Sequence, residues 1–309
     1  MASALPTKHR MLLVDDEPDI HTVTRLSLKG LRYRGCPLEF LSASTGSEAV
    51  QVMKANPDVA VILLDVVMET TSAGLDACRA IREELGNRFV RILLRTGQPG
   101  VAPERQAITQ FDIDGYLPKA ELTADRLYAA VRTAIKAWEE LIELDRHRRY
   151  LTAIHECVAS LRPFEPIEET LQRILDTAVA ICPTNLALLH LETFDKSADA
   201  RKYFLFVSTE PDTVRAEAAA TELAARIARN PGVQSLRSAG NIEEGFLELL
   251  ILHRELGHGW IYLAGVSPDE LVLKLLPMLA AHAANALYSA VAQAMLAARE
   301  GPIYDMMPI

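Results

Sequence analysis

Residues 11–20 read MLLVDDEPDI, an apolar run that ends directly in Asp15, Asp16 and Glu17. Carboxylates this close together repel one another, and each raises the pKa of its neighbours. An apolar run of strand length that stops at polar residues is typical of a buried parallel strand, which delivers side chains to one edge of a sheet. The stretch therefore predicts an α/β fold, and it raises the question of what else reaches the same edge.

Four further apolar runs of strand length follow within the first 120 residues, and helical patterns separate them. The runs lie at 38–43, 59–67, 90–96 and 115–118, and the helical patterns lie at 19–31, 46–56, 75–85, 102–111 and 122–144. Strand and helix alternate five times, which predicts a five-stranded, doubly wound parallel sheet.

Four of the five predicted strands end in residues that can bind a metal or a phosphoryl group. The first delivers Asp15 and Asp16, the third Asp65, the fourth Thr96 and the fifth Lys119. Because parallel strands all point the same way, we expect these residues at one edge of the sheet. Three carboxylates suit a hard dication such as Mg²⁺. A hydroxyl and an ammonium group suit a phosphoryl group carried by a neighbouring carboxylate.

The motifs LLVDDE, LLDVVM, LLRTG and GYLPK, in this order, resemble the receiver domain of two-component response regulators, which has a flavodoxin-like fold. The resemblance implies that Asp65 is the phosphoacceptor and that Asp15, Asp16 and Asp65 hold Mg²⁺. It also implies that the backbone carbonyl of Val67 is a further metal ligand.

The same resemblance implies roles for three residues near the phosphoryl group. Thr96 binds a phosphoryl oxygen, Lys119 pairs with the phosphoryl group, and Thr96 and Tyr116 form the activation switch.

The chain departs from the family pattern in three places. Glu69 stands where the family has a proline, and Gly74 comes one residue late. The family lysine precedes a proline, but here Ala120 follows Lys119 and Pro118 precedes it. We expect the catalytic set to survive these changes and the turn that carries the lysine to differ.

A long helical pattern continues from residue 127 to 161 and carries two apolar stripes. Such stripes pack against the same chain or against a twin helix, and both alternatives stay open. Beyond it, a helix, four strands with few crossovers and a closing helix predict an α+β domain that resembles a GAF domain. We therefore divide the chain into a receiver domain (1–126), a helical linker (127–162), a GAF-like domain (163–300) and a tail (301–309).

A finer resemblance covers residues 66–116. They resemble a receiver subgroup that is followed by a GAF-like module and often by an HD-GYP phosphodiesterase for cyclic di-GMP. The chain contains no HHExxD-like motif, no GGDEF or EAL string and no basic recognition helix. We therefore expect a phosphorelay protein that is not an enzyme beyond gaining and losing its own phosphoryl group.

Composition limits the partners of this 309-residue chain. A net charge of −9 argues against a nucleic-acid partner. We see no apolar run of the length a membrane span needs and expect a cytoplasmic protein. The expected partners are a sensor histidine kinase or phosphotransfer protein, an unknown downstream protein and a second copy in a homodimer. The alternative is a small-molecule sensor whose receiver serves mainly as a dimerisation platform.

Overall fold

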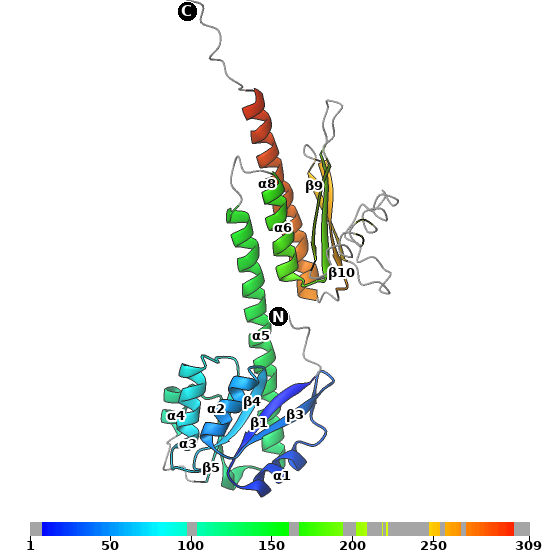
Figure 1. Ribbon diagram of the computed structural model, residues 1–309. Helices are drawn as coiled ribbons and strands as arrows, with labels where there is room; N and C mark the ends of the chain where they lie inside the picture. Colours follow the sequence, from blue (N-terminus) through cyan, green and yellow to red (C-terminus); the bar gives the residue numbers. More distant parts are fainter. Residues whose placement is uncertain are drawn as a thin grey trace, which may run out of the picture. The chain divides into compact units, whose positions relative to one another are not determined.

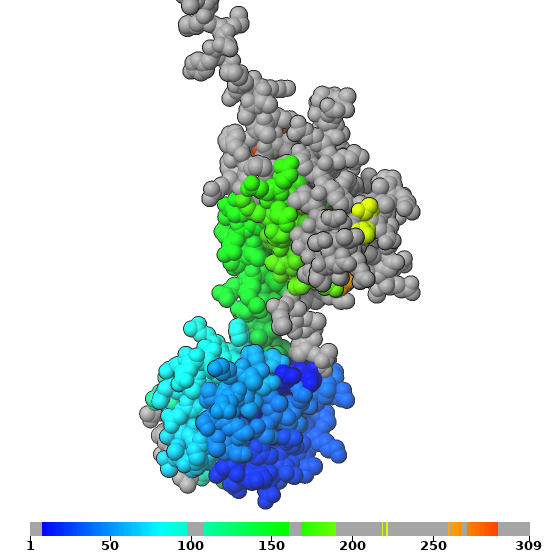
Figure 2. Space-filling model, in the orientation of Figure 1, coloured from blue at the N-terminus to red at the C-terminus, as the bar shows by residue number. Residues whose placement is uncertain are grey.

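The computed structural model describes residues 8–97, 104–160, 167–193, 202–208, 218, 221, 247–253, 257–266 and 270–299. The chain divides into two compact units, of which the first comprises Leu5–Arg146 and the second mainly His147–Ile309. In the space-filling view the first unit is a rounded body, coloured from blue to cyan (Figure 2).

The first unit is a sheet flanked by helices, and Figure 1 labels most of its elements. The strands are β1 (His9–Val14), β2 (Arg32–Tyr33), β3 (Cys36–Ala43), β4 (Val59–Asp65), β5 (Arg91–Thr96) and β6 (Gly115–Pro118). The helices are α1 (Pro18–Ser27), α2 (Gly46–Ala55), α3 (Ala73–Arg79), the π-helical turn η1 (Ala80–Glu84), α4 (Glu104–Phe111), the 3-10 turn η2 (Lys119–Glu121) and α5 (Ala124–Ser160).

The strand order is β2-β3-β1-β4-β5-β6, and β3, β1, β4, β5 and β6 are mutually parallel. The five predicted parallel strands are therefore confirmed. The sixth strand, β2, was not predicted and pairs antiparallel with β3. Arg34 and Gly35 join the two, both with positive φ (49° and 83°). A two-residue hairpin turn needs this conformation at both positions, so β2 is a short edge ribbon added to the parallel sheet.

The sheet is buried on both faces. All seven residues of β4 are buried. Since alternate residues of a strand point to opposite faces, odd and even positions enter different cores. One core joins Leu12, Val14, Ile62, Leu64 and Ile92 to residues of α2 and α3. The other joins Met11, Leu13, Val61, Leu63 and Leu93 to Leu127, Val131, Ile135 and Trp138 of α5. This two-sided burial explains why the strands read as apolar throughout.

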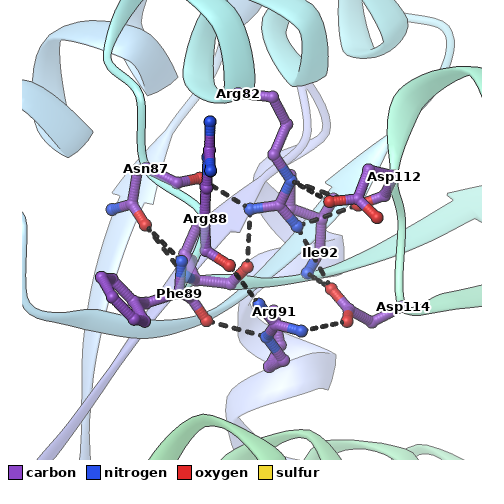
Figure 3. Close-up of polar contacts among 9 residues, drawn as sticks. Arg82, Asn87, Arg88, Phe89, Arg91, Ile92, Asp112 and Asp114 are labelled. Carbon is purple, nitrogen blue, oxygen red and sulfur yellow. Dashed lines mark hydrogen bonds and ion pairs between the residues drawn. The ribbon is translucent and has the colours of Figure 1, made fainter. Parts of the chain in front are cut away.

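Arg82, which lies in η1, stabilises the amino-terminal end of β5 through a network of hydrogen bonds (Figure 3). Its guanidinium donates hydrogen bonds to the carbonyl oxygens of Asp112, Asn87 and Val90, at 2.8–3.2 Å. The Asp114 carboxylate, 3.3 Å from this guanidinium, accepts a 2.8 Å bond from the Ile92 N–H. The side chain of Arg82 is only 9% exposed. The network holds the end of the sheet opposite to Asp65, so its role is structural.

The second unit is an α+β structure. It contains α6 (Ile167–Ile181), β7 (Leu186–Thr193), β8 (Lys202–Ser208), β9 (Leu247–His253), β10 (Gly257–Ala264) and α8 (Glu270–Arg299). The four strands are antiparallel in the order β8-β7-β10-β9. Residues of α6, α8, β7 and β10 share one core with Tyr150, Ile154 and Cys157 of α5. A helix, an antiparallel sheet and a closing helix are thus present as expected, whereas the tail at 301–309 lies outside the described residues.

One helix in the described part of the chain is long and apolar enough to cross a membrane by length and composition alone. It is Leu271–Ser289 within α8, and half of it is buried inside the protein. Lys274 and His282 interrupt this segment, so it is not an uninterrupted apolar run. Its buried leucines and alanines belong to the core of the second unit.

Candidate phosphoryl-acceptor site

Three carboxylates meet at the carboxyl edge of the parallel sheet. Ligand oxygens of Asp15, Asp16 and Asp65 all lie within 4.8 Å of one another. The register explains this, because Val14 pairs with Leu64 and the residue after each is an aspartate. Asp15 and Asp65 are each only 3% exposed, whereas Asp16 is open to solvent. The structure thus brings together the three residues that the sequence placed at this edge.

Asp65 is held on both carboxylate oxygens. Its Oδ1 accepts a 2.9 Å hydrogen bond from the Val66 N–H, and its Oδ2 accepts one of 2.6 Å from Lys119 Nζ. Burial raises the pKa of Asp65 above its ordinary value, the Lys119 ammonium opposes this shift, and the nearby Asp15 carboxylate adds to it. Lys119 therefore favours the ionised, nucleophilic form of a carboxylate that burial disfavours.

Asp15 is also held on both oxygens. Its Oδ1 accepts a 3.0 Å bond from the Glu17 N–H, and its Oδ2 pairs with the guanidinium of Arg95 and lies 3.7 Å from Lys119 Nζ. Arg95 was not predicted as a residue of this site. Its one signal was a charged residue near the end of the apolar strand RILLRT, and its partner stands 80 residues earlier in the chain.

Glu17 stands apart from the three aspartates. It occupies the position that precedes α1, with Pro18 as the first helical residue. Its side chain is 64% exposed, and its Oε1 lies 3.9 Å from Lys119 Nζ. At that distance and exposure it contributes little to the charge balance of the site.

Thr96 lies on β5, the strand next to β4, and Tyr116 lies on β6, the next strand beyond it. Thr96 is 1% exposed at the end of β5, where it pairs in register with Pro118. Tyr116 is half-buried in β6 and packs against the core on the α2–α3 face. Their predicted roles in phosphoryl binding and switching stay predictions, as does the role of the Val67 carbonyl.

The departures from the family pattern have structural explanations. Glu69 Oε1 accepts a 2.9 Å hydrogen bond from the Gly46 N–H at the start of α2. The N–H of Gly74 donates to the Val66 carbonyl oxygen at 3.1 Å, so α3 begins directly against the end of β4. A Cβ on Gly74 would stand 2.0 Å from the Asp65 carbonyl oxygen. Glycine is therefore required one residue later than the family pattern has it.

The turn that carries Lys119 is a short 3-10 helix, Lys119–Glu121. The residue before it, Pro118, is extended, with φ −61° and ψ 128°. The described residues contain no cis peptide bond. Lys119 nonetheless reaches Asp65, so the altered turn preserves the contact that matters.

The three carboxylates suit a magnesium ion. Oxygens on opposite sides of one Mg²⁺ lie about 4 Å apart, because each metal–oxygen distance is about 2.1 Å. The observed limit of 4.8 Å is close to this spacing, so small side-chain rotations would bring the oxygens onto one ion. The solvent exposure of Asp16 leaves one side open for the waters that Mg²⁺ retains.

Comparison with known families identifies this part of the chain. Residues 11–132 match the family described as the response regulator receiver domain. The first unit contains a receiver domain. Receiver domains accept a phosphoryl group on an aspartate, bind Mg²⁺ through an acidic pocket and take the phosphoryl group from a donor such as a histidine kinase. Proteins with receiver domains are typically soluble.

Solved structures of other receiver domains are similar to this one. One from Clostridium thermocellum is 24% identical, with a TM-score of 0.37, and covers 43% of this chain and 98% of its own. The receiver domain of an HD domain-containing protein from Pseudomonas fluorescens Pf-5 is 21% identical, with a TM-score of 0.39, and covers 46% of this chain and 97% of its own.

A curated relative is similar over a longer stretch. The 3'3'-cGAMP-specific phosphodiesterase 2 of Vibrio cholerae is 39% identical over 184 residues, which are 60% of this chain. This match is longer than residues 1–132, so the similarity continues past the receiver domain. The chain spans about a third (34%) of the length of that relative.

The relative corrects one prediction. We expected a receiver protein that is not an enzyme, and this is wrong, because the relative matched at 39% identity is a phosphodiesterase. The motifs of cyclic-dinucleotide enzymes that we looked for in the sequence did not indicate this relationship.

Predictions about the second unit stay predictions. The described residues show four antiparallel strands packed with α6 and α8, but a GAF-like relationship is not tested. The same holds for the predicted domain boundaries, the homodimer and the alternative role as a small-molecule sensor.

Proposed function

We propose that the chain is a phosphorylation-controlled regulatory module of a cyclic-dinucleotide phosphodiesterase, and that Asp65 is its phosphoacceptor. The observation that carries the phosphoacceptor assignment is the 2.6 Å contact between Asp65 and Lys119 inside a cluster of three carboxylates. Asp65 is the one of the three that lies on the central strand β4 and is paired directly with a lysine. The phosphodiesterase assignment is supported by the relative from Vibrio cholerae.

Each residue of the site has a task in phosphoryl transfer. The free oxygen lone pairs of Asp65 attack the phosphorus atom of the donor, whose leaving group departs on the opposite side. Lys119 then pairs with the phosphoryl oxygens, and the Thr96 hydroxyl donates a hydrogen bond to one of them. Asp15, Asp16, Asp65 and the Val67 carbonyl would hold Mg²⁺, which when bound would neutralise phosphoryl charge.

The signal leaves the receiver domain through α5 in this proposal. The added phosphoryl group carries a charge of about −1.5 to −2, which draws Thr96 and Lys119 inward and lets Tyr116 follow. The first turns of α5 pack on the receiver core, and its last turns belong to the core of the second unit. We place the GAF-like second unit between the receiver and the phosphodiesterase as a relay, in a cytoplasmic homodimer.

The phosphoacceptor is tested by incubating the full chain with acetyl phosphate and Mg²⁺ and measuring its intact mass. The wild-type chain should gain one phosphoryl group, and peptide mapping should place it on Asp65. Asp65→Asn should gain none, whereas Asp76→Asn, which alters an exposed aspartate on α3, should behave as the wild type. Labelling of Asp65→Asn at the wild-type level would refute the assignment.

The output is tested separately. We expect that 3'3'-cGAMP hydrolysis by the protein purified with its native partners changes when beryllofluoride, a phosphoryl mimic, is added. Asp65→Asn should abolish this response without abolishing basal hydrolysis. A preparation that binds beryllofluoride and hydrolyses no cyclic dinucleotide would overturn the phosphodiesterase assignment and leave the phosphoacceptor intact.

A further inference from the structure

Arg95 is an unexpected cation in the acidic pocket. It lies one residue before the end of β5, where its neighbours Leu93 and Leu94 are fully buried apolar residues. The side chain of Arg95 is only 7% exposed. A buried guanidinium is expensive unless a partner compensates its charge, so its placement here calls for an explanation.

The register directs Arg95 into the pocket. Arg95 is the in-register partner of Asp65 on the adjacent strand, so the two side chains leave the sheet on the same face. The strand order β1-β4-β5 places Asp65 between Arg95 and Asp15. The guanidinium therefore extends across the end of β4 to reach Oδ2 of Asp15.

The oxygen that Arg95 occupies faces the metal site. Asp15 Oδ2 lies 3.7 Å from Lys119 Nζ, and this same ammonium is 2.6 Å from Asp65 Oδ2. The other oxygen of Asp15 is already occupied by the Glu17 N–H. A metal held jointly by Asp15 and Asp65 would therefore meet the oxygen that Arg95 holds.

Arg95 is also incompletely satisfied where it lies. Its Nε is buried and has no hydrogen-bond partner among the described residues. A buried donor without a partner is unfavourable, so the contact with Asp15 holds the Arg95 side chain in place despite this unsatisfied N–H. Such an arrangement is readily rearranged when another cation competes for the same carboxylate.

From these contacts we infer that Arg95 is a built-in counter-ion that holds Asp15 in the metal-free receiver and competes with Mg²⁺ for it. This positioning role rests on the metal site assigned under the proposed function. Arg95 and Lys119 offset two of the three negative charges of the pocket, so the metal-free site is stable with both acids buried. The same guanidinium lowers the affinity for Mg²⁺, since it repels the ion and occupies an oxygen that would bind it.

The test measures metal affinity rather than activity. Mg²⁺ is titrated into the full chain by isothermal calorimetry at fixed ionic strength, with wild type, Arg95→Met, Arg95→Lys and Arg91→Met. Arg91 lies on the same strand, pairs with Asp114 at 2.6 Å at the opposite end, and its replacement changes net charge equally. We expect Arg95→Met to bind Mg²⁺ about tenfold more tightly than wild type, because one repelling charge and one competitor are gone. Arg95→Lys and Arg91→Met should stay within about twofold of wild type.

A measurement on the unaltered protein covers the case in which Arg95→Met does not fold. The side-chain N–H signal of Arg95, assigned by its loss in Arg95→Lys, should shift during the Mg²⁺ titration with the midpoint found by calorimetry. Equal Mg²⁺ affinity of wild type and folded Arg95→Met, or an Arg95 signal that does not move while Mg²⁺ binds, would overturn the inference and leave the metal site standing. Absence of Mg²⁺ binding in all four proteins would overturn the metal site itself.

Discussion

Replacing Gly74 by alanine should disturb the phosphoacceptor strand through one added methyl group. The new Cβ would stand 2.0 Å from the Asp65 carbonyl oxygen and 2.9 Å from the Val66 Cα, where ordinary contacts are 3.4–4 Å. Both obstacles are backbone atoms, so no side chain can rotate away. Either α3 separates from the end of β4 or the strand shifts, and overpacking of this kind costs about 2–4 kcal/mol.

Gly97, which follows β5, supplies a matched control. A Cβ on Gly97 would meet only the Lys119 Cδ, at 3.6 Å, which is an ordinary contact with the flexible part of a side chain. Gly97→Ala should therefore change the free energy of unfolding by less than about 1 kcal/mol. Both variants add one methyl group near the carboxyl edge of the sheet. They differ in the atoms that this methyl group meets, which are backbone atoms at Gly74 and a flexible side chain at Gly97.

The opening free energy of β4 is measured by hydrogen exchange of the β4 peptide at increasing urea concentration. This measurement reports on the receiver domain alone, which is necessary because a chain of two units does not unfold in one step. The opening free energy of β4 should fall by about 2–4 kcal/mol in Gly74→Ala. Labelling of Asp65 by acetyl phosphate should fall with it, because the acceptor moves with its carbonyl. If β4 in Gly74→Ala were as stable as in Gly97→Ala, the close approach of α3 to the acceptor strand would be wrong.

Three further perturbations address the rest of the molecule. Arg82→Ala removes four hydrogen bonds to three carbonyl oxygens and should lower the stability of β5 against urea by about 2–4 kcal/mol. The exposed Arg79→Ala should lower it by about 0.5 kcal/mol or less, and equal effects of the two variants would contradict the network in Figure 3. His9 Nε2 and Glu139 Oε1 form a buried pair at 2.7 Å. His9→Leu and Glu139→Leu should therefore each destabilise β1 by about 2–4 kcal/mol, and the double variant should lose less than the sum of the two. Additive losses would show that the two side chains are not coupled. Burial raises the pKa of the Cys78 thiol to about 12, so its thiolate fraction grows only as the pH approaches that value. Iodoacetamide at neutral pH should therefore label Cys78 only after the chain unfolds, and rapid labelling of the folded chain would contradict the burial of this thiol.

The meeting of the carboxylates at the sheet edge was predictable, because two rules are enough to place them there. Apolar runs identify the strands, and parallel connections place all their carboxyl ends together. Asp15 and Asp65 follow paired residues, Val14 and Leu64, so their meeting needed no knowledge of side-chain packing. Lys119 reached Asp65 even though the residues around it depart from the family pattern.

Features that depend on distant partners were not predictable. Arg95 resembles any charged residue at a strand end until the register shows that it faces Asp65 and contacts Asp15. The strand β2 has two residues, too few for an alternating pattern to be visible, and its turn rests on Arg34 rather than on a typical turn residue. Likewise, no motif in this sequence indicated a link to an enzyme, and the proposed phosphodiesterase output rests on similarity to a relative.

The helix α5 buries only part of its predicted apolar stripe. The sequence predicts a stripe at Leu151, Ile154, Val158 and Leu161, which packs either on the same chain or on a twin helix. Ile154 is buried, whereas Leu151 is 47% exposed and its neighbour Tyr150 is buried. The buried face of α5 in the second unit is thus turned by one residue, and Leu144 and Leu151, seven residues apart, are both left open to solvent. A spacing of seven on one helix is the spacing of a coiled-coil seam, which supports the proposed pairing with a twin helix. The backbone between Asp65 and the second unit passes along this helix, so pairing and signalling in our proposal act on the same element.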